Sequence, residues 1–421
     1  MRDALSVRGG SQWNGEAGTA PGVRDRVTAL DWWFGRRFQQ FVAPAGVRVE
    51  LWDGSSKWMS DQPPIGDLVV RDRGALVKLL LHPALQFGEL YSEGRVAIRG
   101  ALEGVMEAAN RLTETDRLTL REWLALKFPQ VNSIGRARQN IHHHYDLGND
   151  FYRLWLDRQM VYTCALFPSA DATLEEAQTA KLDLVCRKLQ LRPGETVIEA
   201  GCGWGALALH MARVYGVRVK AFNISREQIR YARERAEREA LAHHVEFIED
   251  DYRTVRGRFD VFVSVGMLEH VGLKHYESLA AVIRQVLDPS SGRGLLHFIG
   301  RDRPRPLNAW IERRIFPGGY PPTVAEVLHH VLEPARQSMH HVENLRLHYA
   351  RTLAHWRARF DAAEADVRGR FGDAFFRAWD LYLAASEGAF AAGTLQLFQI
   401  VFAPSGCAPL FASQPFPERH R

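Results

Sequence analysis

The feature that most constrains this chain is a glycine-rich loop at residues 197–205, which reads VIEAGCGWG. An apolar run leads into it and an apolar-periodic segment follows at once, which predicts a strand, a tight turn and a helix. Gly201 and Gly203 remove side chains where the backbone passes close to a ligand, and the free N–H groups of the helix start face the same place. The loop therefore predicts an α/β fold that binds a nucleoside cofactor.

The spacing of the glycines narrows the choice of cofactor. It is G-x-G-x-G, whereas dinucleotide-binding folds use G-x-G-x-x-G, and the Lys-Ser/Thr of a phosphate-binding P-loop is missing. With Glu199 two residues before the first glycine, the loop resembles the S-adenosylmethionine loop of Rossmann-like methyltransferases. The loop alone leaves open a glycine-rich turn in another kind of α/β protein.

Strands and helices alternate after this loop. Apolar runs predict further strands at residues 217–224, 245–249, 259–265 and 294–299, with helical segments between them. This order predicts a parallel, doubly wound sheet whose ligands bind at the carboxyl ends of the strands. Polar candidates near those ends are Asn223, Asp250, Asp251, Glu269, His270 and His297.

The end of the second predicted strand departs from the usual pattern. Many cofactor-binding folds of this kind place an acid there for the ribose hydroxyls, but this chain has Asn223. Ser225 reads as a helix N-cap, with Gln228 three residues later as in a capping box. We expect Asn223, Ser225 and Gln228 to contact the cofactor in place of the acid.

The length of 421 residues suggests two or three domains. We expect a disordered tail at 1–25, an α+β domain at 26–130 for docking or dimerisation, a linker at 131–145, a catalytic domain at 146–404 and a tail at 405–421. Residues 29–42 predict a short amphipathic helix, which either packs on its own domain or contacts a membrane. Three adjacent histidines at 142–144 do not predict a metal site, because consecutive helical residues point to different sides.

Composition limits the environment and the partners. The net charge of +5 fits anionic partners, either nucleic acid or the anionic face of a bilayer, and it fits a soluble basic protein without such a partner at least as well. No apolar run approaches the roughly 20 residues of a membrane span, and no secretory signal is visible. The four cysteines have no paired spacing, which fits a reducing compartment and predicts neither zinc nor disulfides.

A set of motifs resembles one family over residues 141–403. The motifs are HHYDLGNDF, YTCALF, EAGCGWG, NISREQ, VSVGMLEHVG, LLHFIG, IERRIFPGGYPP and LQLFQIVF. In this order and spacing they are similar to cyclopropane-fatty-acyl-phospholipid synthases and to the related mycolic-acid cyclopropane synthases. The resemblance implies a Rossmann-like class I methyltransferase that uses S-adenosylmethionine, with a smaller N-terminal α+β domain.

The resemblance also implies a bicarbonate ion in the active site. Its expected ligands are Cys164, Glu269, His297, Ile299 and Tyr349, with Cys164 and Ile299 binding through backbone N–H. The double bond of an unsaturated acyl chain would attack the sulfonium methyl group, and a cation would form on the chain. An ordered anion would stabilise this cation and remove the proton whose loss closes the ring.

The expected cofactor contacts combine the resemblance with strand-end positions. They are Tyr162, Thr163, Glu199, Gly201, Gly203, Asn223, Ser225, Gln228, Asp251 and Tyr252. Three positions depart from the family pattern: Thr163 stands for Ser, Asn223 for Thr, and Leu166 for an aromatic residue that would shape the acyl pocket.

The resemblance implies a cytoplasmic enzyme, peripheral at the inner face of the cell membrane, that acts on unsaturated phospholipid acyl chains, and it allows a homodimer. The alternative is a fatty-acyl C-methyltransferase that forms the same cation but leaves a methyl branch or a methylene. A nucleic-acid methyltransferase is disfavoured, because residues 266–271 read GMLEHV where amino-methylating members carry Asp/Asn-Pro-Pro-aromatic. We therefore expect no nucleic-acid partner.

Overall fold

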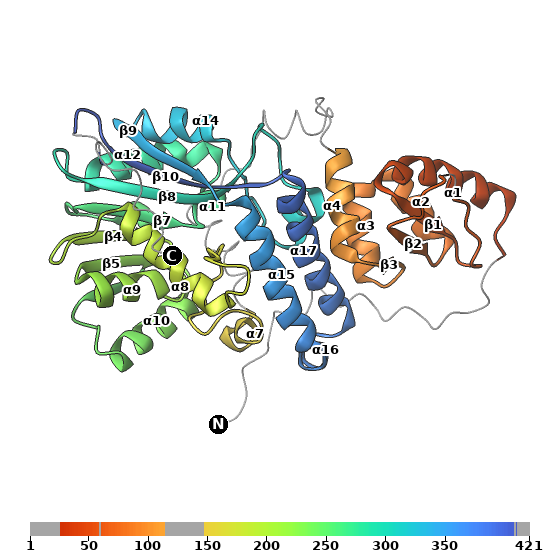
Figure 1. Ribbon diagram of the computed structural model, residues 1–421, viewed down its shortest axis with the longest axis horizontal. Coiled ribbons are helices and arrows are strands. Elements are labelled where there is room, and N and C mark those ends of the chain that lie inside the picture. The colour runs from red at the N-terminus through yellow and green to blue at the C-terminus, as the bar shows by residue number, and fades with distance from the viewer. Residues whose placement is uncertain (1–25, 59, 114–146, 408–409, 411–421) are drawn as a thin grey trace, which may run out of the picture. The chain divides into compact units, whose positions relative to one another are not determined.

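The computed structural model describes residues 26–58, 60–113, 147–407 and 410 (Figure 1). The chain forms two compact units, each made of several stretches. Unit 1 comprises Met1–Leu118, Leu307–Pro317 and Ala350–Thr394, and unit 2 comprises Thr119–Pro306, Gly318–Tyr349 and Leu395–Arg421. The predicted linker, the histidine run, the predicted tail at 1–25 and most of the predicted tail at 405–421 lie outside the described residues.

Unit 2 is built on a seven-stranded sheet in the order β6-β5-β4-β7-β8-β10-β9. The strands are β4 (Thr196–Ala200), β5 (Arg218–Asn223), β6 (Val245–Glu249), β7 (Val261–Val265), β8 (Arg293–Gly300), β9 (Gln337–Asn344) and β10 (Gln396–Pro404). The first five run parallel, as predicted, but β10 pairs antiparallel with both β8 and β9. The prediction of parallel strands is therefore confirmed for β4 to β8, and β10 and β9 extend this sheet beyond β8, with β9 at its edge.

Apolar residues of the sheet pack on both of its faces. Val197 and Leu295 belong to one core cluster, whereas their neighbours Ile198 and Leu296 belong to another. Successive strand residues point to opposite faces, so a fully buried strand feeds two cores. Figure 1 shows the helices that cover these faces: α8 (Leu174–Lys188), α9 (Ala206–Tyr215), α10 (Arg226–Arg238) and α12 (Tyr276–Val286).

Helix α8 begins at a capping box. The Thr173 side chain accepts a hydrogen bond from the backbone of Glu176, and the Glu176 side chain accepts one from the backbone of Thr173. Two donors that the helix start leaves unpaired are thereby satisfied. The capping box therefore defines where the helix begins. Two lysines on this helix, Lys181 and Lys188, are buried.

Unit 1 contains a three-stranded sheet, β1 (Val47–Glu50), β2 (Gly66–Val70) and β3 (Val96–Gly100). Its helices are α1 (Ala29–Val42), α2 (Arg73–Leu81), α3 (Pro83–Ser92), α4 (Leu102–Thr113), α13 (Ala309–Arg314), α16 (Glu364–Phe371), α17 (Asp373–Ala392) and most of α15 (Arg346–Ala362). Pro83 separates α2 from α3, since it cannot continue α2 but fits the first position of the next helix. Gly388 on α17 lies so close to the α4 backbone that a Cβ there would come within 2.5 Å of Glu107 N.

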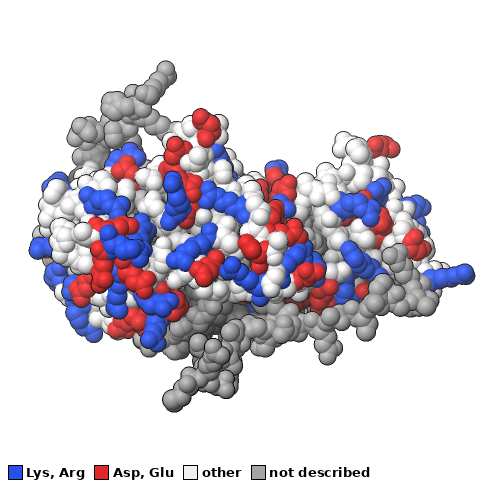
Figure 2. Space-filling model, turned by 90° about the horizontal axis from the view of Figure 1, so that it is seen from below, with Lys and Arg blue, Asp and Glu red and all other residues white. Residues whose placement is uncertain are grey.

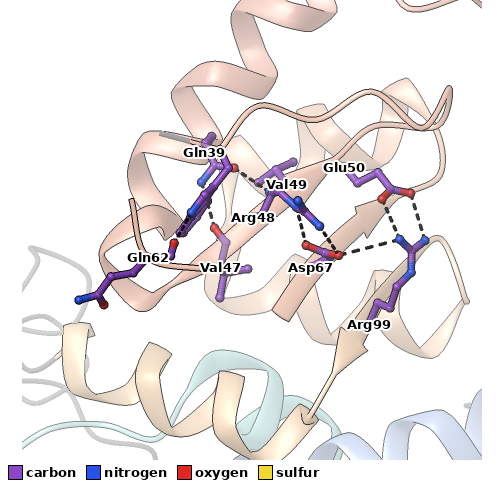
Figure 3. A network of polar contacts seen from close by, with 9 residues as sticks. Gln39, Val47, Arg48, Val49, Glu50, Gln62, Asp67 and Arg99 are labelled. Carbon is purple, nitrogen blue, oxygen red and sulfur yellow. Dashed lines mark hydrogen bonds and ion pairs between the residues drawn. The ribbon is translucent and has the colours of Figure 1, made fainter. Parts of the chain in front are cut away.

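A buried side chain joins α1 to β1 in unit 1 (Figure 3). Gln39 donates from Nε2 to Val47 O at 2.9 Å and accepts at Oε1 from Val49 N at 2.7 Å. Across the sheet, the guanidinium of Arg48 pairs with the carboxylate of Asp67 at 2.7 Å. The helix therefore takes the place of a neighbouring strand for two backbone groups of β1.

Charged side chains of both signs are interspersed on the face shown in Figure 2, where neither sign forms a continuous field. Charged side chains of the described residues also form surface pairs, such as Lys220 with Glu246. Among the described residues, no helix combines the length and the apolar character that crossing a membrane requires.

Candidate active site

The predicted glycine loop connects β4 to α9 with three residues in the left-handed region. The φ angles are +86° at Gly201, +53° at Gly203 and +83° at Gly205. At Gly205 a Cβ would lie 2.6 Å from the Phe247 ring, so this glycine allows close packing inside the protein. At Gly203 a Cβ would meet nothing within 4 Å, so this glycine keeps space open for a ligand.

That space belongs to a cavity at the carboxyl ends of the central strands. Seven predicted cofactor residues line it: Tyr162, Thr163, Glu199, Gly201, Gly203, Asn223 and Gln228. The other three do not. Ser225 is the buried N-cap of α10, Asp251 pairs with Arg253 at 2.7 Å, and Tyr252 lies in the short helix η3 (Tyr252–Thr254).

Two amide side chains at the end of β5 form a pair beside the loop. Asn223 donates from Nδ2 to Gln228 Oε1 at 2.6 Å and to Gly203 O at 3.3 Å. These bonds hold Asn223, at the position usually occupied by an acid, against the glycine loop. An Asn–Gln pair can still contact ribose hydroxyls, because each amide offers both a donor and an acceptor.

The cavity contains a buried lysine that the sequence did not reveal. Lys181 on α8 lines the cavity and donates from Nζ to Thr163 Oγ1 at 2.9 Å. Burial lowers the pKa of Lys181 to about 8 and raises the pKa of the nearby Glu199 to about 8, while the attraction between their charges opposes both shifts. The spacing of seven between Lys181 and Lys188 places both lysines on one side of α8, but only the packing of the folded chain shows that this side is buried.

Glu269 and His297 are buried polar groups at adjacent strand ends. Glu269 lies on α11 (Leu268–Val271), and its Oε1 accepts a hydrogen bond from the backbone N–H of Ile299. Its Oε2 and the Nε2 of His297 have no hydrogen-bond partner within the described part of the chain. Burial raises the pKa of Glu269 to about 7 and lowers the pKa of His297 well below its usual range. Met267 and His270, on either side of Glu269, line the cofactor cavity.

The segments that carry Cys164 and Tyr349 lie together. The Cys164 Sγ is buried 4.0 Å from Leu345 O, and the N–H of Phe167 donates to His348 Nδ1 at 3.1 Å. Tyr349 is buried in the first turn of α15. The segments 164–167 and 345–348 are therefore in contact, although they lie far apart in the sequence.

The arrangement can bind a ligand with both charge and apolar surface. A buried polar atom without a hydrogen bond costs free energy unless a ligand supplies the missing partner. The two such atoms of Glu269 and His297, which lack a partner among the described residues, therefore fit a small polar ligand. In the described ranges no cluster of His, Cys, Asp and Glu could hold a metal ion.

Comparison with known proteins identifies the family. The family model described as mycolic acid cyclopropane synthetase matches residues 132–400. A probable fatty acid methyltransferase from Pseudomonas putida is 34% identical over 368 residues, which cover 84% of this chain and 91% of that protein. The cyclopropane-fatty-acyl-phospholipid synthase of Escherichia coli K12 is 38% identical over 354 residues, 80% of this chain and 87% of that synthase.

Solved structures agree with this assignment. The cyclopropane synthase MmaA2 from Mycobacterium tuberculosis matches with a TM-score of 0.60 and 30% identity, covering 63% of this chain and 98% of that one. The mycolic acid cyclopropane synthase CmaA1, solved with SAH and CTAB, matches with a TM-score of 0.60 and 29% identity over 63% of this chain and 97% of that one. The chain therefore belongs to the mycolic acid cyclopropane synthetase family of S-adenosylmethionine-dependent methyltransferases.

Proposed function

We propose that this enzyme adds a methylene bridge to the double bond of unsaturated phospholipid acyl chains. The observation that carries the proposal is the pair of buried, unpartnered atoms Glu269 Oε2 and His297 Nε2 beside the cofactor cavity. A methyl group transferred to an alkene leaves a cation on the chain, and ring closure then requires the loss of a proton. Buried polar groups at that place suit an anion that meets this cation.

S-adenosylmethionine, when bound, supplies the carbon atom that is added. Gly203 leaves the space for it, and Tyr162, Thr163, Asn223 and Gln228 would hold its polar groups. Lys181 keeps the Thr163 hydroxyl in place from the protein side. Glu199 and Lys181 together add no net charge to the cavity when both are ionised.

A bicarbonate ion would fit the second part of the site and supply a basic oxygen. Glu269, His297, Tyr349 and the N–H of Cys164 would hold it, and Ile299 would steady Glu269 by the hydrogen bond it donates now. With its pKa raised to about 7, Glu269 carries a proton in part of the molecules at neutral pH, and in that form it can donate the proton to the anion, which avoids repulsion between two negative charges.

Helix α1 offers a surface for the membrane. Leu30, Trp33 and Phe41 are 62%, 53% and 59% exposed, and with Arg37 they follow a helical spacing of three, four and four residues. The guanidinium of Arg37 lies over the Trp33 ring at 5.4 Å. The apolar side chains would enter the bilayer, and the basic group beside them would contact anionic headgroups. Together these contacts would dock the enzyme at the inner face of the cell membrane.

The second candidate is a fatty-acyl C-methyltransferase, favoured by the 34% identity to the Pseudomonas protein. An assay with purified enzyme, S-adenosylmethionine and vesicles of monounsaturated phospholipid, followed by analysis of the acyl chains, distinguishes the two functions. Cyclopropane formation predicts that the acyl chain gains the mass of one CH2 and loses its alkene proton signals. A gain of the same mass with a retained alkene signal, on a chain that now carries a methylene group or a methyl branch, supports the C-methyltransferase instead.

A further inference from the structure

A chain of polar contacts in unit 2 reaches His297 from the side opposite its unpartnered nitrogen. Lys188 Nζ donates to Glu343 Oε2 at 2.5 Å and to Gln399 Oε1 at 2.6 Å. Gln399 Nε2 lies 3.0 Å from His297 Nδ1. Gln399 and His297 are register partners on β10 and β8, so their side chains project from the same face of the sheet.

The chemistry of Lys188 sets the direction of every bond in this chain. An ammonium group only donates, so it must face the amide oxygen of Gln399. The NH2 group of that amide then faces His297, and because it also only donates, His297 Nδ1 must accept. A neutral imidazole that accepts at Nδ1 carries its proton on Nε2.

Burial excludes the opposite orientation of the Gln399 amide. The side chain of Lys188 is 1% exposed, and Gln399 and His297 are buried as well. Rotating the Gln399 amide would set its NH2 against the ammonium and leave two buried donors facing each other. Glu343, with 39% of its side chain exposed, balances the charge of Lys188 without contacting His297.

We propose that Lys188 and Gln399 are positioning residues that hold His297 as the Nε2–H tautomer, so that it offers the active-site anion a fixed donor and cannot act as the base. This inference rests on the proposed function for its role in turnover, but the tautomer follows from the contacts alone. A second proton on Nδ1 would have to displace the Gln399 amide. The pKa of His297 is lowered well below its usual range by burial and by the charges of Lys181 and Lys188, so the ring stays neutral.

The tautomer can be read directly in the full-length protein. With ring 15N-labelled histidine, the protonated and the bare nitrogen of a neutral imidazole give well-separated signals, which a His297→Gln variant assigns by difference. We expect His297 to be protonated at Nε2 and bare at Nδ1 at neutral pH. Protonation at Nδ1, or at both nitrogens, overturns the proposal.

Variants separate positioning from simple stability. Lys188→Met removes the anchor, and we expect kcat to fall by about tenfold, the effect of one hydrogen bond to a charged group, with KM for S-adenosylmethionine unchanged and an Nδ1–H population appearing. Glu343→Gln breaks the ion pair but keeps an acceptor for Lys188, so we expect kcat within about twofold of the wild type. Lys220→Met, at a surface pair with Glu246, is the matched control.

Equal losses in Lys188→Met and Glu343→Gln would overturn the proposal, because the ion pair and not the amide would then matter. An unchanged tautomer in Lys188→Met would overturn it too. If Lys188→Met does not fold, the labelled wild type still decides the tautomer. A wild type that makes no product from phospholipid would refute the proposed function but would leave the tautomer to be judged by its 15N signals.

Discussion

The carboxylate of Glu269 is bound to the backbone N–H of Ile299, two residues along β8 from His297. One oxygen of Glu269 is thereby fixed, whereas the other is buried without a partner in the described chain. Strand β8 therefore carries His297 and also positions Glu269.

Replacing Glu269 with Gln should lower kcat by about 100-fold or more, the usual effect of losing a group that assists proton transfer. Affinity for S-adenosylmethionine, measured by calorimetry, should change little, since Glu269 does not line the cofactor cavity. Glu246→Gln at the surface is the control. Near-normal turnover in Glu269→Gln would contradict the proposed anion site.

The raised pKa of Glu269 predicts a pH-dependent stability. In the unfolded chain the pKa of this carboxyl is near its ordinary value of 4.5, but burial raises this pKa to about 7 in the folded protein. Between these values the folded state binds more protons than the unfolded state, so the free energy of unfolding falls as pH rises, by roughly 3 kcal/mol at most. Glu269→Gln should lose this part of the pH dependence.

Urea unfolding of both proteins at several pH values from 4.5 to 8 measures the effect. The free energy of unfolding of Glu269→Gln, relative to that of the wild type, should rise up to about pH 7 and then stay constant. Glu199 and Glu387, whose pKa values are also raised by burial, are present in both proteins and cancel. A constant difference between the two proteins across this range would contradict the assigned shift.

Gly203→Ala should weaken cofactor binding by about tenfold or more, because the methyl group enters space that the ligand needs. The left-handed backbone at Gly203 adds a folding cost of about 1–2 kcal/mol for any other residue. Gly194→Ala is a matched control, since Gly194 has a φ of +85°, open space around its Cβ and no place in the cavity. Equal affinity in the two variants would show that the cofactor does not approach Gly203.

Leu30→Glu should weaken binding to vesicles that contain anionic phospholipid, because a charge would enter the apolar face of α1. Val214→Glu on α9, at a residue that is 56% exposed, is the control for a new surface charge. Sedimentation with vesicles measures both variants. Turnover of a detergent-dispersed substrate should stay near normal in both, and equal vesicle binding by the two would refute the α1 docking surface.

The α/β fold and the cofactor loop could be predicted from the sequence. The spacing of Gly201, Gly203 and Gly205 depends on backbone conformations that are local to the turn, and the alternation of strands and helices follows from local periodicity. The predicted order of strands likewise placed Glu269 and His297 near strand ends. These features could be read because each is encoded within a few neighbouring residues.

The hydrogen bonds that position those groups could be seen only in the folded chain. Lys181 and Lys188 look like ordinary helix residues until the packing of α8 buries them, and the antiparallel β10 sets Gln399 opposite His297 although 102 residues separate them. The proton position on His297 depends on that pairing. Hydrogen bonds between distant residues leave no local pattern in a sequence, so these positions became visible only once the chain was folded.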